Sequence, residues 1–424
     1  MAWSRGGAAI AVAALCVALL PGRAVAAIPA EDVPGSAPAY RPAADAVPIE
    51  GTASSADGPE LERAGIYTDT IGRGQKKYYR VQLDDTSNAF VSTVLAPPPG
   101  SRSGILDGIR VSLASTDGTQ CGTGESVTFG GESTRPVAGY ASRRIESNRP
   151  CQQAGEYLYT VEWAGAGTGG AAAQDWPIEL TYMAEPGLKP GAADPQVPTG
   201  WSSKAPSSNS GTPRKATGGT GFNDAAAVDQ GAWRDDVRPG ESRFYKVPVA
   251  WGQQLFLRAQ LANSASGSGS FAVNGLRLAL YNTARGQVAD KSTSYTGAPT
   301  GLDLGTAPAA YANRSSSGSG GQQAMRFQGW YYIQVSLDPK VPSSVPLTLD
   351  VDLKGTAQAG PAYDGDAEAA GFGLADTGVA AGGSVTMRVV GIAGIGIGTV
   401  LVLGLGAWYA IGRRGRRSAG AHAA

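Results

Sequence analysis

Histidine, cysteine and charge are all scarce in this chain. Its single histidine is His422, its three cysteines form no Cys-x-x-Cys pair, and charged residues make up 17% of the sequence. Serine–histidine and cysteine–histidine catalysis, histidine-ligated metal centres, zinc ribbons and redox pairs are therefore nearly excluded. Because 35 basic residues balance 35 acidic ones, a nucleic-acid-binding protein with a broadly basic surface is excluded as well. We expect no metal site, no cofactor and no catalytic residue.

Long amphipathic helices are also missing from the middle of the chain, whereas glycine and proline are abundant. The 424 residues include 61 glycines and 27 prolines, about a fifth of the chain against an average nearer an eighth. Short alternating stretches separated by glycine-rich turns are typical of β-sandwich and jelly-roll domains. We therefore predict an all-β fold of two tandem β-sandwich domains, with a signal peptide before them and one transmembrane helix after them.

Residues 1–27 have the parts of a secretory signal peptide. Arg5 supplies the positive charge, and the apolar run 8–20 is too short to span a bilayer comfortably. Small residues follow, and cleavage is expected after Ala26 or Ala27; an uncleaved N-terminal anchor is the alternative. The signal-peptidase region comprises Ala24, Ala26 and Ala27.

The C-terminal region combines an uncharged apolar run with a basic tail. Residues 389–411 carry no charge and are numerous enough to cross a bilayer as a helix. The positive-inside rule then makes the tail, 412–424, cytoplasmic and everything upstream extracellular. The tail's charges are Arg413, Arg414, Arg416 and Arg417.

A pentapeptide at 374–378 precedes this run. Together with the short linker, the apolar run and the arginines that follow, it resembles the cell-wall sorting signal of Gram-positive surface proteins, in the Leu-Ala-x-Thr-Gly form of streptomycete-like bacteria. The resemblance implies that a sortase cleaves after the threonine and joins it to an amine of the peptidoglycan precursor. The alternative is a permanent single-pass membrane anchor. The residues of the motif are Leu374, Ala375, Asp376, Thr377 and Gly378.

Three segments rich in proline, glycine, serine or alanine divide the exported part of the chain. They contain too few apolar residues to form a core, and their lengths predict domains strung along the chain rather than fused. The predicted order is linker 28–48, domain 49–185, linker 186–216, domain 217–354 and linker 355–373.

An internal repeat supports two homologous domains. Residues 65–81 align with 231–247 without a gap, and three later segments match in the same order: 107–113 with 274–280, 155–163 with 329–337, and 177–182 with 346–351. Each segment alternates as a half-buried strand does. Identical residues include Gly65 and Gly231, Asp69 and Asp235, Gly74 and Gly240, and Tyr79 and Tyr245.

The first two strands of each repeat are separated by a glycine-containing turn, where Gly74 and Gly240 suit the third position of a type II turn. This strand–turn–strand, with an aromatic-Tyr-basic-Val second strand, resembles the pre-peptidase C-terminal-type domains of bacteria. The resemblance implies small jelly-roll modules that assist binding or stability without catalysis of their own. The long segments near 114–150 and 282–328 depart from it as insertions.

After removal of the signal peptide, two cysteines remain, Cys121 and Cys151. In an oxidising exterior they are expected to form a disulfide; a free reactive pair is the alternative.

Acidic and aromatic residues offer the remaining candidates for chemistry. Asp69 and Asp235 are interpreted as structural acids that bond backbone N–H groups, in preference to calcium or ligand-binding carboxylates. A glycosidase pair among Glu125, Glu132 and Glu146 would need two carboxylates about 5–10 Å apart. Six aromatic residues could line a sugar-binding face, although packing in a sandwich core is favoured: Tyr157, Tyr159, Trp163, Trp330, Tyr331 and Tyr332.

These features lead to three hypotheses. The first is a wall-anchored, non-enzymatic surface protein that binds a protein or a glycan or builds surface structure, with sortase and the peptidoglycan precursor as partners. The second is a membrane-retained accessory subunit of a membrane or secretion complex. The third is a hydrolase with two close carboxylates.

Overall fold

A computed structural model describes residues 37–374, except residue 123 and the segments 166–174, 193–197, 199–200, 203, 205–210 and 265–270. The signal peptide, residues 375–378 of the sorting motif, the predicted transmembrane run and the basic tail lie outside the described residues. No helix in the described part of the chain combines the length and apolar character that a membrane span requires.

The first domain is a sandwich of two five-stranded sheets, and its pairings are antiparallel except for the short strands β1 and β2. One sheet has the order β1 (Val47–Pro48), β3 (Ile66–Ile71), β10 (Trp176–Glu185), β5 (Asn88–Leu95), β8 (Val137–Arg143). The other has the order β2 (Glu60–Leu61), β4 (Lys76–Leu83), β9 (Gly155–Ala164), β6 (Gly108–Ser115), β7 (Glu125–Thr128).

The second domain repeats this arrangement strand for strand. Its first sheet has the order β11 (Arg214–Lys215), β13 (Gly231–Val237), β20 (Val345–Lys354), β15 (Gln254–Leu261), β18 (Thr300–Gly305). Its second has the order β12 (Ala226–Ala227), β14 (Ser242–Val249), β19 (Gly329–Leu337), β16 (Ala272–Tyr281), β17 (Gln287–Tyr295). Two short helices, η1 (Tyr311–Ser315) and α1 (Gly320–Ala324), follow β18.

The predicted all-β fold of tandem sandwiches is confirmed, and the matched sequence segments occupy equivalent strands: β3–β4 and β13–β14, β6 and β16, β9 and β19, β10 and β20. The segments near 114–150 and 282–328 each contain two edge strands, β7–β8 and β17–β18. The turns that join the first strand pairs also match. Gly74 and Gly240 both have φ +73°, and in each turn the fourth N–H donates to the first carbonyl, as a type II turn requires.

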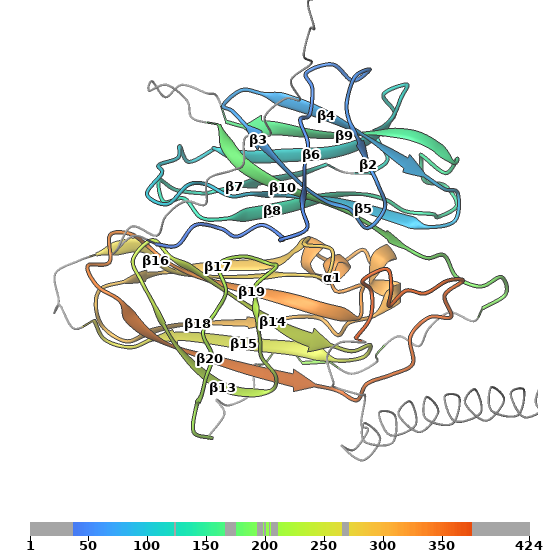
Figure 1. Ribbon diagram of the computed structural model, residues 1–424. Helices are drawn as coiled ribbons and strands as arrows, with labels where there is room; N and C mark the ends of the chain where they lie inside the picture. Colours follow the sequence, from blue (N-terminus) through green and yellow to red (C-terminus); the bar gives the residue numbers. More distant parts are fainter. Residues whose placement is uncertain are drawn as a thin grey trace, which may run out of the picture.

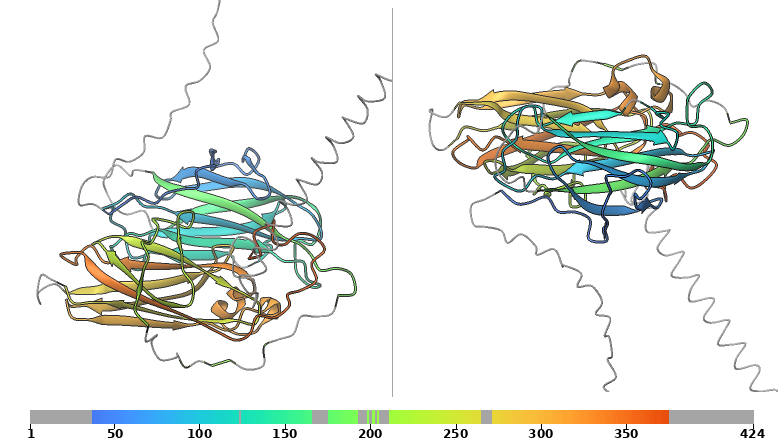
Figure 2. Two further views of the ribbon diagram at one scale, coloured as in Figure 1. Left: turned by 60° about the horizontal axis from the view of Figure 1, so that its bottom comes forward. Right: turned by 90° about the horizontal axis from the view of Figure 1, so that it is seen from above.

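The two sandwiches pack directly on one another, so that four sheets lie in layers (Figure 1). The sheet of β3, β10, β5 and β8 faces the sheet of β14, β19, β16 and β17, and the views in Figure 2 show this contact along a broad face. All eight residues of strand β5 are buried. One face of the strand lies in the core of its own sandwich, and the other lies between the domains. The expectation of domains strung along the chain was therefore wrong.

Apolar and aromatic residues from both domains fill the contact. One cluster places Val94 and Ala138 of the first domain against Phe222, Phe244 and Tyr281 of the second. Another places Phe90 of the first domain against Phe327, with the two rings edge to face at 5.0 Å between centroids. Composition could not indicate this contact, because most of these side chains belong to strands whose other residues already form the two cores, and Phe222 and Phe327 lie in loops.

Described residues of all three linkers contact this body. In the first, Tyr40 packs against the interdomain cluster, and in the second Leu188 forms a bridge with Tyr363 of the third. The third ends in a capped helical turn that inserts Phe372, 2% exposed, beside Phe90 and Phe327.

The turn at 366–372 follows helix-capping rules on a small scale. The Asp366 carboxylate accepts from the N–H of Ala369, and at the other end Phe372 N–H donates to Ala367 O while Gly371 N–H donates to Glu368 O. This is the Schellman pattern, in which the residue before the last has positive φ. Gly371 has φ +87°. The turn thus closes on glycine and directs Phe372 into the contact.

Candidate functional site

The repeated aspartates are held within their own domains. Asp69 Oδ2 accepts from Tyr79 OH at 2.7 Å and Asp235 Oδ2 accepts from Tyr245 OH at 2.7 Å. Each carboxylate also accepts two backbone N–H groups, from Gly51 and Thr70 for Asp69 and from Gly218 and Asp236 for Asp235. With a cation beside each, Lys77 and Arg243, these acids connect the first strands of each sandwich, as their structural interpretation requires.

No group of three or more metal-ligating side chains gathers in the part of the chain that the structure describes. Gly65 immediately precedes β3, and Gly231 is the first residue of β13; these are the strands that carry the aspartates. The aspartates and tyrosines of the repeat signature bond to one another within each sandwich.

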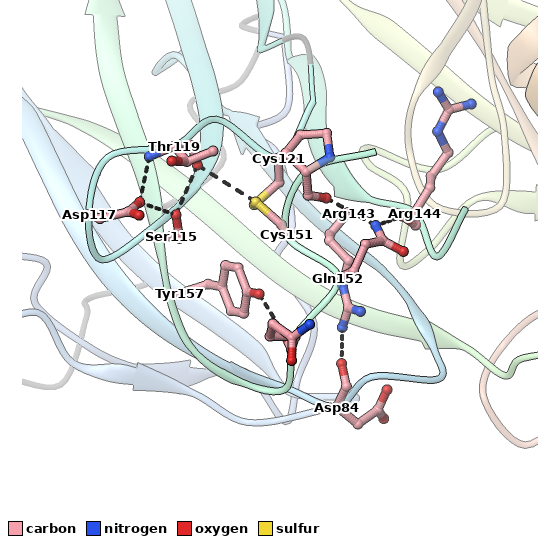
Figure 3. Close-up of a disulfide and its surroundings, with 12 residues drawn as sticks. Asp84, Ser115, Asp117, Thr119, Cys121, Arg143, Arg144, Cys151, Gln152 and Tyr157 are labelled. Atoms are coloured by element: carbon pink, nitrogen blue, oxygen red, sulfur yellow. Dashed lines mark hydrogen bonds between the residues drawn. A yellow bond between two sulfur atoms is a disulfide. The ribbon is translucent and has the colours of Figure 1, made fainter. Parts of the chain in front are cut away.

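The disulfide between Cys121 and Cys151 is present (Figure 3). Its Cα atoms are 5.2 Å apart, and it joins the turn after β6 to the loop that follows β8. Cys121 is buried and its N–H donates to Leu113 O, so the bridge ties the loop at 144–154 to a core strand. A disulfide of this kind is typical of proteins in oxidising compartments.

The three glutamates proposed as a catalytic pair have separate partners. Glu125 Oε2 accepts from Tyr140 N–H at 2.7 Å, Glu132 lines a cavity between the domains, and Glu146 is surrounded by arginines. No contact joins any two of them within the described residues. Burial raises the pKa of Glu125 to about 7, although the bond from Tyr140 opposes the shift.

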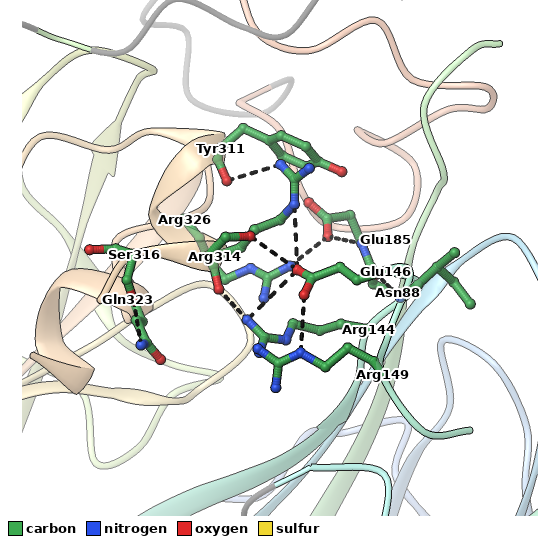
Figure 4. Close-up of polar contacts among 12 residues, drawn as sticks. Asn88, Arg144, Glu146, Arg149, Glu185, Tyr311, Arg314, Ser316, Gln323 and Arg326 are labelled. Carbon is green, nitrogen blue, oxygen red and sulfur yellow. Dashed lines mark hydrogen bonds and ion pairs between the residues drawn. The ribbon is translucent and has the colours of Figure 1, made fainter. Parts of the chain in front are cut away.

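Glu146 belongs to a group of charges that spans the two domains (Figure 4). It accepts from Arg149 Nε at 3.1 Å and lies 3.9 Å from Arg144 and 3.7 Å from Arg314 of the second domain. Beside it, Glu185 accepts from Asn88 at 2.8 Å and from Tyr363 OH at 2.8 Å and pairs with Arg326 at 3.4 Å. The arginines pair with these two glutamates, and the pairs hold the loop of Arg314 against the first domain.

A second interdomain network is centred on Glu179 of β10. Arg285 of the second domain donates to Glu179, and Asn223 donates to Glu179 Oε2 at 2.8 Å. Tyr40 OH and the N–H of Ala43 also donate to this carboxylate, at 3.2 and 2.8 Å. Burial raises the pKa of the Tyr40 phenol, which keeps it protonated as a donor. One carboxylate thus joins the N-terminal linker to both domains.

Two hollows on the surface of the described body are relevant to a binding site. The first, about 170 Å³, lies at the seam between the domains and includes Ser133, Arg135, Arg277 and Asp338. These four residues have internal partners: Ser133 donates to Asp338 at 2.6 Å, Arg277 Nε donates to Asp290 at 2.8 Å and Arg135 donates to Phe129 O at 2.7 Å. The seam cavity is smaller than the usual range for small-molecule sites, about 300–1,000 Å³.

The second hollow, about 480 Å³, lies at the start of β15 beside Trp201. Trp201 is 55% exposed and comes from the segment that composition marked only as a linker. The aromatic residues proposed from the sequence are different: Tyr157, Tyr159, Trp163 and Tyr331 are buried in the sandwich cores. In the sequence, the feature that indicated this hollow was an isolated tryptophan in a polar, glycine-rich segment.

Trp330 and Tyr332 are half-buried, and Tyr332 packs against the interdomain cluster. The core interpretation of the six aromatic residues therefore fits their positions better than a continuous sugar-binding face.

No protein-family model and no curated protein matches the chain. Among solved structures, it is similar to the pre-peptidase C-terminal domain of a collagenase from Bacillus anthracis, with 11% identity, 34% of this chain and 100% of that one covered, and a TM-score of 0.19. The tandem CBM51 modules of a family 98 glycoside hydrolase from Streptococcus pneumoniae give 10% identity, 68% and 83% coverage and a TM-score of 0.20. The tandem CBM22 domains of Xyn10C from Paenibacillus barcinonensis give 12% identity, 69% and 92% coverage and a TM-score of 0.19.

Proposed function

We propose that this chain is an exported, non-enzymatic binding protein of the cell surface, attached to peptidoglycan through Thr377 by a sortase. The observation that carries the proposal is where the folded body ends. Phe372 is the last residue buried between the domains, and the sorting pentapeptide begins two residues later, at Leu374. The pentapeptide thus begins where the folded body ends, with Leu374 half-buried, which fits the anchoring of a folded extracellular body at its C-terminal end.

Two further features support an outside location and a binding role. The disulfide between Cys121 and Cys151 stabilises the first sandwich where thiols oxidise. The two outermost sheet faces carry polar residues, for example Arg80 and Glu156 on one side and Arg258 and Asp303 on the other. Such polar faces suit exposure to water, so we expect a ligand to bind at the hollows and loops instead.

A second candidate is a membrane-retained accessory subunit of a membrane or secretion complex. The uncharged run 389–411 and the arginines after it favour this reading, because they form a complete single-pass anchor if no cleavage occurs. The two proposals differ in the fate of the chain from Gly378 onward.

Mass spectrometry of the C-terminal peptide, after muralytic digestion of the wall, tests the proposal. We expect a chain that ends at Thr377 and carries a peptidoglycan fragment. Thr377→Ala should retain the arginine tail in the membrane fraction, whereas Asp376→Ala, at the variable position of the motif, should still be sorted. An intact tail on the wild-type protein would reject wall anchoring and favour the membrane subunit.

A further inference from the structure

The hollow beside Trp201 has the composition of a small carbohydrate site. Trp201 is the single tryptophan of the described residues that is largely exposed: Trp163, Trp176 and Trp251 are buried, and Trp233 and Trp330 are half-buried. No aromatic or cationic side chain stacks on its ring within the described chain. An exposed indole offers a flat apolar face and one N–H donor.

A buried glutamine holds the segment of Trp201 in place. Gln254, 4% exposed, donates from Nε2 to Ser202 O at 2.5 Å and to Thr306 O at 2.7 Å, while its Oε1 accepts from Ser202 N–H at 3.3 Å. Both backbone groups of Ser202 are therefore bonded to one side chain at the start of β15. This bonding fixes the residue next to Trp201 on the second sandwich, so the indole is attached to the body of the domain.

The walls of the hollow combine apolar surface with positive charge. Phe256 and Pro308 supply buried apolar walls, and Lys204 and Lys354 stand exposed at the rim. Lys354 lies 3.0 Å from Asp352, whereas Lys204 has no acidic partner within the described residues. The volume, about 480 Å³, lies in the usual range for small-ligand sites.

We propose that this hollow binds an acidic sugar, a pyranose ring that carries a carboxylate and belongs to a surface glycan. The apolar face of the ring would lie on the Trp201 indole, and the carboxylate would face Lys204 and Lys354. The lining carries two lysines and no acid, so charge complementarity favours an acidic ring over a neutral one. This inference rests on the proposed function and identifies the ligand class that it leaves open.

The test uses the full-length chain, purified in detergent, with isothermal titration calorimetry. The probes are a galacturonic acid tetrasaccharide and the neutral galactose tetrasaccharide of the same linkage. We expect measurable binding of the acidic probe, and at least tenfold weaker binding of the neutral one. Trp201→Ala should weaken acidic binding about tenfold, a loss of roughly 1.4 kcal/mol, whereas Trp201→Phe should stay within about threefold of the wild type.

Two controls keep the result specific. Phe271→Ala removes another exposed aromatic side chain, 63% exposed and outside the hollow, and should leave binding unchanged. Lys204→Ala should weaken binding of the acidic probe severalfold. Equal melting temperatures for all variants would exclude unfolding as the cause.

The outcomes separate this inference from the function on which it rests. Acidic binding that survives Trp201→Ala would overturn the site while leaving a surface binding protein. Equal affinity for both probes would overturn the acidic ligand class. No binding of either probe by a chain whose Thr377 is linked to peptidoglycan would overturn the sugar site and leave surface display intact.

Discussion

Arg285, at the turn between β16 and β17, donates to Glu179 on β10, and the two side chains are 8% and 1% exposed. The pair connects the two sandwiches across their contact. Forming a buried pair costs desolvation free energy. Removing one partner is strongly destabilising, because the other charge is then buried without compensation.

Glu179→Ala should lower the free energy of unfolding by about 3–5 kcal/mol. The double variant Glu179→Ala with Arg285→Ala should lose less than the sum of the single losses, because it leaves no buried charge unpaired. Urea denaturation of the four species of this cycle measures the coupling. Additive losses would show that Glu179 and Arg285 have no coupling free energy and that the pair does not stabilise the contact between the domains.

Phe372→Ala should lower the free energy of unfolding by about 3–5 kcal/mol, because it leaves a cavity beside Phe90 and Phe327. The loss should also release the turn at 366–372 and make it sensitive to protease. Phe271→Ala, which changes the same side chain at an exposed position, should stay within about 0.5 kcal/mol of the wild type. Equal protease resistance in both variants would contradict the docking of the C-terminal segment.

The disulfide should stabilise the chain by about 3–4 kcal/mol. Cys121 and Cys151 are 30 residues apart, and the constraint on the unfolded chain grows with the closed loop. The double variant Cys121→Ser with Cys151→Ser should lower the free energy of unfolding by this amount, and reduction of the wild type should do the same. Urea denaturation measures both losses. Thiol labelling of the denatured, unreduced protein should find no free cysteine at either position, and labelling of Cys121 would refute a permanent bridge.

Stability should fall as pH rises from about 4.5 to 7 because of Glu125. Its pKa is raised from 4.5 to about 7 in the folded state by burial, so the folded protein binds this proton more tightly than the unfolded chain does. The resulting stabilisation is complete below about pH 4.5, is lost as the pH rises to about 7, and changes no further above that. The expected loss is roughly 1–3 kcal/mol, reduced by the partial exposure of the side chain. The neighbouring phenols of Tyr140 and Tyr159 have raised pKa values and stay neutral over this range.

Denaturant titrations at pH 5 and pH 7.5 measure this effect. Glu125→Gln should flatten the slope, because the amide oxygen still accepts from Tyr140 N–H without titrating. A slope that persists in the variant would assign the dependence to other groups.

Much of the architecture could be predicted from the sequence because it depends on local patterns. Alternation along 79–83 and 276–280 placed strands, and the spacing of Gly74 and Gly240 placed turns that need positive φ. The repeat then implied equal topologies, since segments that match in order fold alike. The roles of Asp69 and Asp235 were also accessible, because an acid beside a turn has N–H groups within reach.

The contact between the domains was not accessible in this way. Phe90 and Phe327 lie in segments that are far apart in the chain, and no periodicity tells whether the second face of a buried strand meets water or another domain. The linkers were misjudged for the same reason: a single Phe372 or Tyr40 in a polar segment becomes an anchor only where a partner surface exists.

The sequence by itself determined the class of fold, the duplication and the disulfide pair, because each depends on composition, spacing or neighbours in the chain. Tertiary structure alone decided that the two sandwiches form one layered body, that Glu179 and Arg285 face each other in it, and that Trp201 stands open beside Gln254. Those relationships depend on which surfaces meet, and burial of apolar faces from distant segments is a property of the whole fold.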